Sequence, residues 1–221
     1  MGIYMKKYKD YQLYYYDDNI EKILEKIINK DYQVEEEYKN DRRTYVAKIR
    51  IEDKVYILKR TFQKNILKKI IGIFRKNNSV ETFENVNRAK KNIEELADVY
   101  GVGLNKKLFV EDEFFLMECI EGEIYIDDEH YLRILEVLKK VHRNRYYHGD
   151  SNPYNFLFDK DEKIHIVDTK MKKMCFGNYR AHYDILTLFK YFREIKLEYP
   201  YEKNIFYWIA YLKREIRNTK N

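Results

Sequence analysis

The chain has 221 residues, of which 45% are hydrophobic and 36% are charged, so it can bury a sizeable core beneath a heavily solvated surface. Its formal net charge of +6 suits anionic partners such as nucleotides, phosphorylated sugars or acidic lipid surfaces. Cys119 and Cys175 lie outside any C-x-x-C pattern, which excludes a disulfide framework and a zinc site of that type. With no signal-peptide pattern and no apolar run that could span a bilayer, the sequence predicts a cytoplasmic protein.

The first predicted helix follows Asp17, whose side chain can cap the free amide groups of a helix N-terminus. Apolar residues then recur at helical spacing and predict one buried face, made of Ile20, Ile23, Leu24, Ile27 and Ile28. Three strands separated by polar turns are predicted next, over residues 32–38, 44–51 and 54–59.

The third of these strands ends on Lys59. Such a lysine is ordinarily just solvated, whereas in a kinase-like lobe it holds the α- and β-phosphates of ATP. A second helix is predicted over residues 81–100, with Gly101 ending it. In a kinase-like lobe this helix supplies the acid that pairs with the lysine, for which Glu84 is the first candidate and Glu81 the second. A glutamate on a helix is otherwise usually solvated.

No acidic residue occurs between Lys54 and Val80, and Ile, Leu and Phe recur there at helical spacing among lysines and arginines. A basic amphipathic helix is therefore predicted over about residues 62–80. It could lie on an anionic membrane surface or bind a phosphorylated polymer, or it could pack on its own domain with a solvated basic face. The sequence leaves both interpretations open.

A hairpin of residues 108–110 and 113–118 is predicted to lead into a connector, residues 119–122. Backbone groups of Glu118 and Ile120 could bond the edge of an adenine there, although any strand exit has the same pattern. Later helices are predicted over residues 130–143, 184–192 and 204–216, and the first is expected to bury Leu132, Leu135, Leu138 and Val141.

The most specific pattern is HGDSNPYN, residues 148–155, followed by a strand that ends on Asp168. The residues between predict a hairpin, with strands over 156–158 and 164–167. This hairpin would bring Asp150, Asn155 and Asp168 to one edge. An Asp, an Asn five residues on and a second Asp thirteen residues beyond that is the spacing by which kinase-like folds hold a base and two magnesium ligands. The pattern predicts phosphotransferase chemistry, the ordinary alternative being that these side chains only form turns.

This order of strands, lysine, helix, connector, HGD…N loop and strand-ending Asp resembles the protein-kinase-like superfamily. More narrowly, the chain resembles the lipopolysaccharide core heptose (heptose II) kinase family. Three stretches carry the resemblance: KRTF at residues 59–62 with the basic segment after it, the loop of residues 148–156, and VDTK at residues 167–170 leading to RAHYDILTL at residues 180–188.

The resemblance implies an α+β fold: one small bilobal kinase-like domain of residues 1–221, with an antiparallel-sheet N-lobe over 1–118 and a mainly helical C-lobe over 119–221. It also implies transfer of the γ-phosphate of ATP to a heptose hydroxyl of the lipopolysaccharide inner core, with Mg²⁺ as cofactor. The protein would act at the cytoplasmic face of the inner membrane, which the basic segment of residues 62–80 could touch peripherally.

By position, the resemblance assigns Asp150 as the base that deprotonates the sugar hydroxyl, and Asn155 and Asp168 as Mg²⁺ ligands. Mg²⁺ takes few protein oxygens and keeps waters, which suits one Asp and one Asn. The remaining implied roles are holding ATP for Lys59, supporting the loop for His148, and bracing it from the following helix for Asp184.

The chain departs from the wider kinase pattern at three points. No Gly-rich loop precedes Lys59, so backbone amides, or Arg42 and Arg43, would have to cover the phosphates. Asp168 is followed by Thr and Lys rather than Phe and Gly, and no Ala-Pro-Glu segment is present. These departures argue against a protein substrate.

Two other functions compete. A small-molecule kinase of the aminoglycoside or choline type shares the HGD…N and Asp chemistry, but its cationic acceptors call for an acidic site, and the basic segment argues against that. A kinase-like scaffold that binds nucleotide without catalysis has no need to keep Asp150, Asn155 and Asp168 together. Nucleic-acid binding is not expected, because no helix-turn-helix, zinc or stacking motif accompanies the basic clusters.

Overall fold

The computed structural model describes residues 2–62, 78–106, 110–175, 177–191 and 198–218. The chain is mixed α+β, as the sequence predicts, and it divides into two compact units. The first unit comprises Met1–Asn87 and Asp98–Cys119, and the second comprises Arg88–Ala97 and Ile120–Asn221. The predicted basic helix of residues 62–80 falls largely on residues 63–77, which lie outside the described residues.

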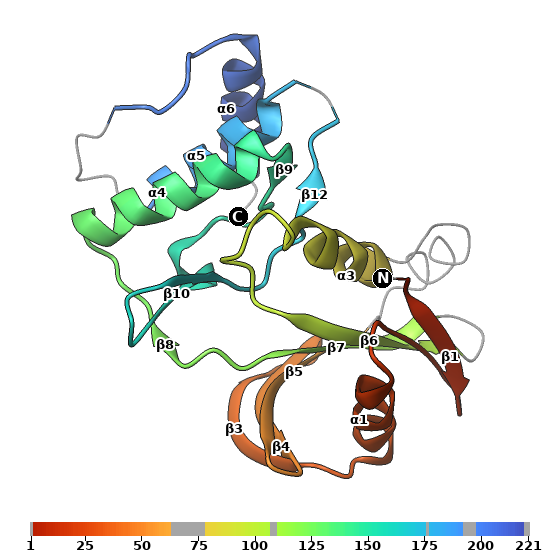
Figure 1. The fold of residues 1–221 in the computed structure, drawn as a ribbon. Helices are drawn as coiled ribbons and strands as arrows, with labels where there is room; N and C mark the ends of the chain where they lie inside the picture. The colour runs from red at the N-terminus through yellow and green to blue at the C-terminus, as the bar shows by residue number, and fades with distance from the viewer. Residues whose placement is uncertain (1, 63–77, 107–109, 176, 192–197, 219–221) are drawn as a thin grey trace. The chain divides into compact units, whose positions relative to one another are not determined.

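The first unit is built on an antiparallel sheet that has seven strands among the described residues (Figure 1). The strands are β1 (Tyr4–Tyr8), β2 (Tyr11–Tyr15), β3 (Gln33–Asn40), β4 (Thr44–Ile51), β5 (Lys54–Phe62), β6 (Val99–Lys106) and β7 (Val110–Glu118). Their order across the sheet is β1-β2-β6-β7-β5-β4-β3. The three strands predicted between residues 32 and 59 are confirmed as β3, β4 and β5. The hairpin of β1 and β2 is not predicted by the sequence, because β1 shows no alternation of buried residues.

Helix α1, Asp18–Asn29, covers one face of this sheet. Its N-terminus is capped as predicted, since the side chain of Asp17 accepts the N–H of Asn19 at 2.8 Å. Leu24 and Ile27 are buried against alternate residues of the strands, which are Leu13, Tyr15, Ala47, Ile49, Ile51, Tyr56, Leu58, Phe114 and Leu116. This layer is the larger hydrophobic core of the unit.

Helix α3, Asn78–Ala89, packs on the other face of the sheet. Its Val80 and Phe83 are buried against Val102 and Leu104 of β6. Successive side chains of a strand point to opposite faces, so β7 packs Phe114 and Leu116 on the α1 side of the sheet and Phe115 on the α3 side.

The predicted helix of residues 81–100 is wrong beyond Ala89, where the chain turns, and Val99 opens strand β6. Gly101 therefore lies inside a strand and does not end a helix. A Cβ at Gly101 would lie 2.8 Å from a methyl carbon of Leu24, so the close approach of α1 to the sheet requires glycine there.

The hairpin predicted from residues 108–110 and 113–118 is wrong in its first strand. The second stretch lies in β7, but β7 pairs with β6, which begins at Val99. Two glycines interrupt the apolar alternation of β6, so the sequence pattern does not predict this strand. Residues 107–109 lie outside the described residues.

The second unit combines helices with two small sheets. Its elements are β8 (Gly122–Glu123), α4 (Asp128–Arg143), β9 (Tyr146–Tyr147), a 3-10 turn (Pro153–Asn155), β10 (Phe156–Asp159), β11 (Ile164–Ile166), β12 (Lys172–Lys173), α5 (Tyr179–Phe189) and α6 (Ile205–Asn218). The sheet orders are β11-β10-β8 and β12-β9, and the hairpin predicted around residues 156–167 is confirmed as β10 and β11.

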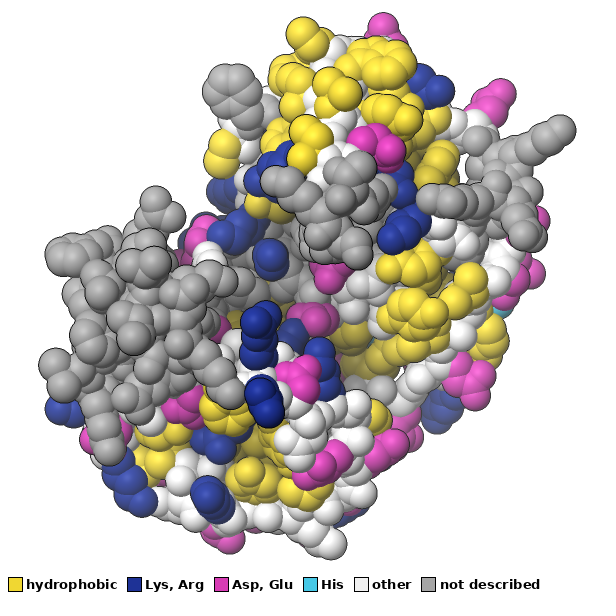
Figure 2. All heavy atoms as spheres, turned by 180° about the vertical axis from the view of Figure 1, so that it is seen from behind, with side chains coloured by type: hydrophobic (Ala, Val, Ile, Leu, Met, Phe, Trp, Pro, Cys, Tyr) yellow, Lys and Arg dark blue, Asp and Glu magenta, His cyan; other side chains and the backbone are white. Residues whose placement is uncertain are grey.

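Helix α4 buries three of its four predicted residues, but Leu132 is 48% exposed, because the buried stripe passes through Tyr131 and Ile134 instead. Helix α6 packs on α5 through Tyr207 and Ala210. Its outer face is apolar and exposed, and hydrophobic side chains gather over it at the top of Figure 2; they include Ile205, Trp208, Ile209, Leu212 and Ile216. None of the described helices has the length and apolarity needed to cross a membrane.

Candidate functional site

A buried carboxylate on α5 holds the first part of the loop of residues 148–155. The side chain of Asp184 is 1% exposed. Its Oδ2 accepts the N–H of His148 at 2.6 Å, and its Oδ1 accepts the N–H of Gly149 at 3.0 Å. The hydroxyl of Ser151 donates to the main-chain oxygen of Asp184 at 2.7 Å. Asp184 thus fixes the path of the loop backbone from the following helix, and hydrogen bonds to an ionised acceptor are stronger than ordinary ones.

The loop turns at Gly149, whose φ of 87° lies in the region that favours glycine. The next residue, Asp150, is exposed, and its Oδ1 accepts Nδ2 of Asn152 at 3.2 Å. Its main-chain oxygen accepts Nδ2 of Asn155 at 2.7 Å. Asn155 itself is buried at the end of the 3-10 turn. The structure therefore brings Asp150 and Asn155 together and leaves the carboxylate of Asp150 in solvent.

Asp168 is tied to the same loop through both of its neighbours in the chain. The N–H of Val167 donates to the main-chain oxygen of Asn155 at 2.9 Å. The hydroxyl of Thr169 donates to the main-chain oxygen of His148 at 3.0 Å. Between these two bonds Asp168 has a φ of 47°, a left-handed conformation that few non-glycine residues adopt. Its side chain is exposed. The three residues that the sequence singled out therefore belong to one region of the second unit.

The ring of His148 is buried beneath the loop. Its Nδ1 accepts the N–H of Asp150 at 3.3 Å, so the ring proton of the neutral form is on Nε2. Burial lowers the pKa of His148, and the nearby carboxylates of Asp184, Asp150 and Asp168 oppose that shift. The buried ring, which accepts a backbone N–H, supports the loop from beneath.

The oxygens at this edge suit a hard divalent cation. Nδ2 of Asn155 is engaged by the main chain of Asp150, which leaves its Oδ1 as the atom to face a cation. The exposed carboxylate of Asp168 supplies the charge. One carboxylate and one amide oxygen fit Mg²⁺, which keeps several waters and takes few protein ligands. No cluster of three or more His, Cys, Asp or Glu side chains suited to a metal ion occurs in the part of the chain that is described.

Lys59 and Glu84 share one side of the sheet in the first unit. Lys59 follows the buried Leu58 in β5, so its side chain points to the face that α3 covers. Across the strands it pairs with Phe115, which packs in the α3 cluster. Glu84 lies on α3 one turn after Val80 and is half-buried. Both residues therefore lie on the side of the sheet that α3 covers.

The two connector residues fall in different units, Glu118 in the first and Ile120 in the second. The N–H of Glu118 donates to the main-chain oxygen of Asp98 at 2.9 Å, and its side chain accepts the N–H of Asp98 at 2.9 Å. Because this amide is already bonded, Glu118 could meet an adenine edge only through its main-chain oxygen.

Three polar side chains that hold the loop were not singled out by the sequence: Ser151, Thr169 and His142. Nε2 of His142 lies 3.2 Å from Oδ2 of Asp184. Ser151 and Thr169 each follow a site aspartate in the chain. That position was the only sequence signal of their role in holding the loop. His142 reaches Asp184 from α4, and this contact depends on how two helices pack.

No protein-family model matches the chain, and no curated protein matches its sequence. What the site does is therefore inferred from its own residues.

Proposed function

We propose that the protein is an ATP- and Mg²⁺-dependent phosphotransferase with a bilobal kinase-like fold. One observation carries this: Asp150 and Asn155 are hydrogen-bonded in the braced loop, and Asp168 is tied to that loop on both sides. A base and two metal ligands in this order are the working parts of a kinase. The two compact units support the fold, since one holds the large antiparallel sheet and the other holds α4, α5 and α6.

In the proposed reaction the acceptor hydroxyl attacks the γ-phosphorus of ATP. The exposed carboxylate of Asp150 takes the hydroxyl proton, the new O–P bond forms, and the bond from the γ-phosphorus to the bridging oxygen breaks to release ADP. Asn152, bonded to Oδ1 of Asp150, orients that carboxylate. Asn155 and Asp168 would hold Mg²⁺, which supplies neutralising charge for the phosphates. Lys59 would hold the α- and β-phosphates, with Glu84 as the first candidate and Glu81 as the second for the acid that pairs with it.

The acceptor that we assign is a heptose hydroxyl of the lipopolysaccharide inner core. The support is the sequence resemblance in residues 148–156, 167–170 and 180–188, together with a net charge of +6 that suits an anionic acceptor. The last of these stretches lies within α5 and includes Asp184, so the residues that carry the resemblance also brace the loop. The protein would then work at the cytoplasmic face of the inner membrane, on ATP and the core sugar.

The test is transfer of labelled γ-phosphate from Mg-ATP to phosphate-deficient lipopolysaccharide core. Wild type is compared with Asp150→Asn and with Asp161→Asn, a control that makes the same change at an exposed turn residue of the same unit. Label in the saccharide is expected with wild type and Asp161→Asn and not with Asp150→Asn.

The other outcomes separate the parts of the proposal. Mg²⁺-dependent ATP binding without label in the core would keep the kinase and reject the heptose acceptor, and a screen of soluble acceptors would follow. Absence of both label and nucleotide binding would reject the phosphotransferase and leave a non-catalytic scaffold.

A further inference from the structure

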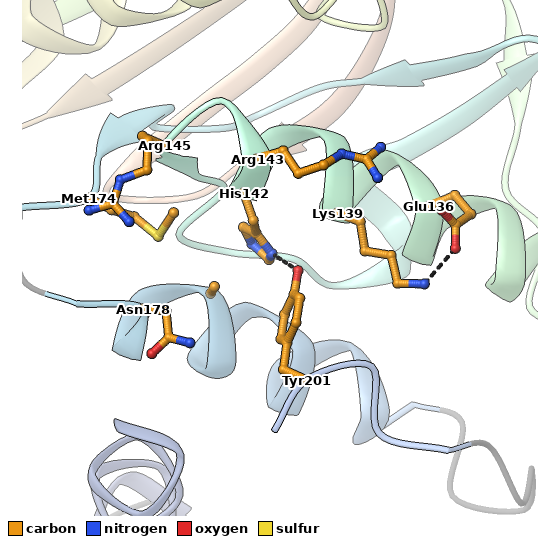
Figure 3. A pocket seen from close by; sticks show the side chains of 9 residues that line it. Glu136, Lys139, His142, Arg143, Arg145, Met174, Asn178 and Tyr201 are labelled. Atoms are coloured by element: carbon orange, nitrogen blue, oxygen red, sulfur yellow. Dashed lines mark hydrogen bonds and ion pairs between the residues drawn. The ribbon is translucent and has the colours of Figure 1, made fainter. Parts of the chain in front are cut away.

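A second concave site lies in the second unit, between the C-terminal part of α4 and the start of α5 (Figure 3). Its volume is about 400 Å³, which is enough for a small metabolite. Three cationic side chains line it, Lys139, Arg143 and Arg145, together with Asn178 and Tyr201. None of these residues belongs to the phosphotransferase site described above. We call this site the α4–α5 pocket.

The pocket carries excess positive charge. Lys139 is neutralised by Glu136, one turn before it on α4, at 2.6 Å. The guanidinium groups of Arg143 and Arg145 make no ion pair or hydrogen bond with any other residue that the structure describes. Two arginines with uncommitted donors beside one cavity are a ready receptor for an anion, because the guanidinium fork matches phosphate and carboxylate geometry.

The backbone at Arg145 would accept glycine. Arg145 follows the C-cap residue Asn144 of α4 and has a φ of 62°, a left-handed conformation at the position where helices most often place glycine. Its main-chain oxygen accepts the N–H of Met174 at 2.8 Å, a bond that glycine would make equally well. Lys30 has a similar φ of 58° at the end of α1, so this backbone does not by itself mark a functional side chain. A change of Arg145 to glycine therefore removes the guanidinium without straining the backbone.

Uncharged polar groups line the opposite wall of the α4–α5 pocket. Asn178 stands at the N-terminus of α5 without capping it, and its Oδ1 is buried with no hydrogen-bond partner in the described part of the chain. The hydroxyl of Tyr201 lies 2.7 Å from Nδ1 of His142, as Figure 3 shows. Met174 and Ala181 add apolar surface. The pocket thus combines charged donors, neutral polar atoms and a hydrophobic wall.

We propose that the α4–α5 pocket binds a small organic phosphate, with Arg143 and Arg145 on the phosphate group. Asn178 and the apolar wall would meet the rest of the molecule. Asn178 is the N-cap residue of the eleven-residue helix α5, and a helix N-terminus favours an anion. The residues that would bind this ligand differ from those that would bind ATP, so the proposal does not depend on the phosphotransfer reaction.

The test is calorimetric titration of the full chain at low ionic strength with glucose 6-phosphate, inorganic phosphate and glucose. The variants are Arg145→Gly, the double variant Arg143→Gln/Arg145→Gly, and Arg88→Gln as a control at an exposed arginine outside the pocket. Wild type and Arg88→Gln are expected to bind glucose 6-phosphate and not glucose. Each arginine removed is expected to weaken binding by about tenfold.

Thermal unfolding distinguishes a binding residue from a structural one. Arg145→Gly is expected to melt close to the wild-type temperature, because glycine tolerates the left-handed backbone. Three results would overturn the proposal: undiminished binding in the double variant, no binding of either phosphate to wild type, or a marked fall in melting temperature for Arg145→Gly. Inorganic phosphate binding as tightly as glucose 6-phosphate would assign the pocket to free phosphate and overturn the organic ligand.

Discussion

Each unit of the protein contains a carboxylate that is largely removed from water, and the two are stabilised in different ways. In the first unit, Asp112 accepts the hydroxyl of Tyr11 at 2.9 Å and lies 3.7 Å from the guanidinium of Arg60. In the second unit, Asp184 accepts two backbone N–H groups, those of His148 and Gly149. The first carboxylate is paired with side chains only, whereas the second is paired with two main-chain amides as well as with the ring of His142.

The difference separates stability from geometry. A side-chain cluster such as that of Asp112 contributes energy to the sheet, and its loss leaves a charged partner behind. A carboxylate bonded to consecutive amides also dictates where a loop runs, so its loss displaces whatever that loop carries. The loop that Asp184 holds includes Asp150 and Asn155. Four measurements test the contrast between Asp184 and Asp112.

The largest effect is expected for Asp168, the proposed metal ligand. Asp168 is exposed, and Asn accepts its left-handed backbone, so Asp168→Asn should unfold like wild type. Transfer of γ-phosphate is expected to fall about a thousandfold, because the charge on the proposed metal ligand is gone. Steady-state transfer and Mg²⁺-dependent ATP binding are both measured, and binding should weaken as well. Substantial activity in this variant would remove Asp168 from the proposed site.

Asp184→Asn should damage stability and activity together. Asparagine presents an N–H₂ group where one of the two amides needs an acceptor, and we expect a loss of about 3 kcal/mol in unfolding free energy. Urea denaturation measures the loss, and transfer is assayed where the variant is still folded. A folded variant with full activity would show that the loop keeps its path without the brace.

Asp112→Asn should lower stability and spare the loop. The side chain of Arg60 is 14% exposed and would lose its counter-charge, for a cost of about 2 kcal/mol in unfolding free energy. Because the change is confined to the sheet, the proposed transfer activity per folded molecule is expected to match wild type. A fall in activity comparable to that of Asp184→Asn would erase the contrast between the two carboxylates.

The fourth measurement concerns a pH dependence that belongs to the second unit, which contains all five histidines of the chain. Burial lowers the pKa of His148 and of His182, so the unfolded chain takes up protons near its ordinary pKa of about 6.5 that the folded state refuses. Stability is therefore expected to be level above about pH 7 and to fall below about pH 6.5, by up to about 1.4 kcal/mol per pH unit for each histidine. Fluorescence of Trp208, the single tryptophan, follows unfolding of this unit in urea at several pH values. Stability that rises on acidification would contradict the burial of these rings.

Regular alternation and local motifs carried the correct predictions. Strand β4 was predicted with both ends right, because its buried and half-buried residues alternate between polar turns. The pattern of residues 148–155 placed Asp150 and Asn155 on a loop, and the following hairpin placed Asp168 beside them. Chemistry at fixed spacing within one stretch can be recognised before the fold is known.

What the sequence could not predict depends on contacts between distant elements. Gly103 suits β6 because a Cβ there would clash with the ring of Phe114, and this packing has no signal in the sequence. The α4–α5 pocket likewise joins Arg145 at the end of one helix to Asn178 at the start of another. The sequence around either residue does not predict that the two line one pocket.

The bonds from His148 and Gly149 to Asp184 also make these two amides reporters of an event elsewhere in the chain. Each can exchange its proton for deuterium only when its bond to the carboxylate breaks, and the carboxylate belongs to α5. Their exchange rates should therefore follow those of the α5 amides and not those of an ordinary surface loop. Where α5 stays protected while these two exchange quickly, the loop opens by itself; where all exchange together, the helix and the loop form one cooperative unit.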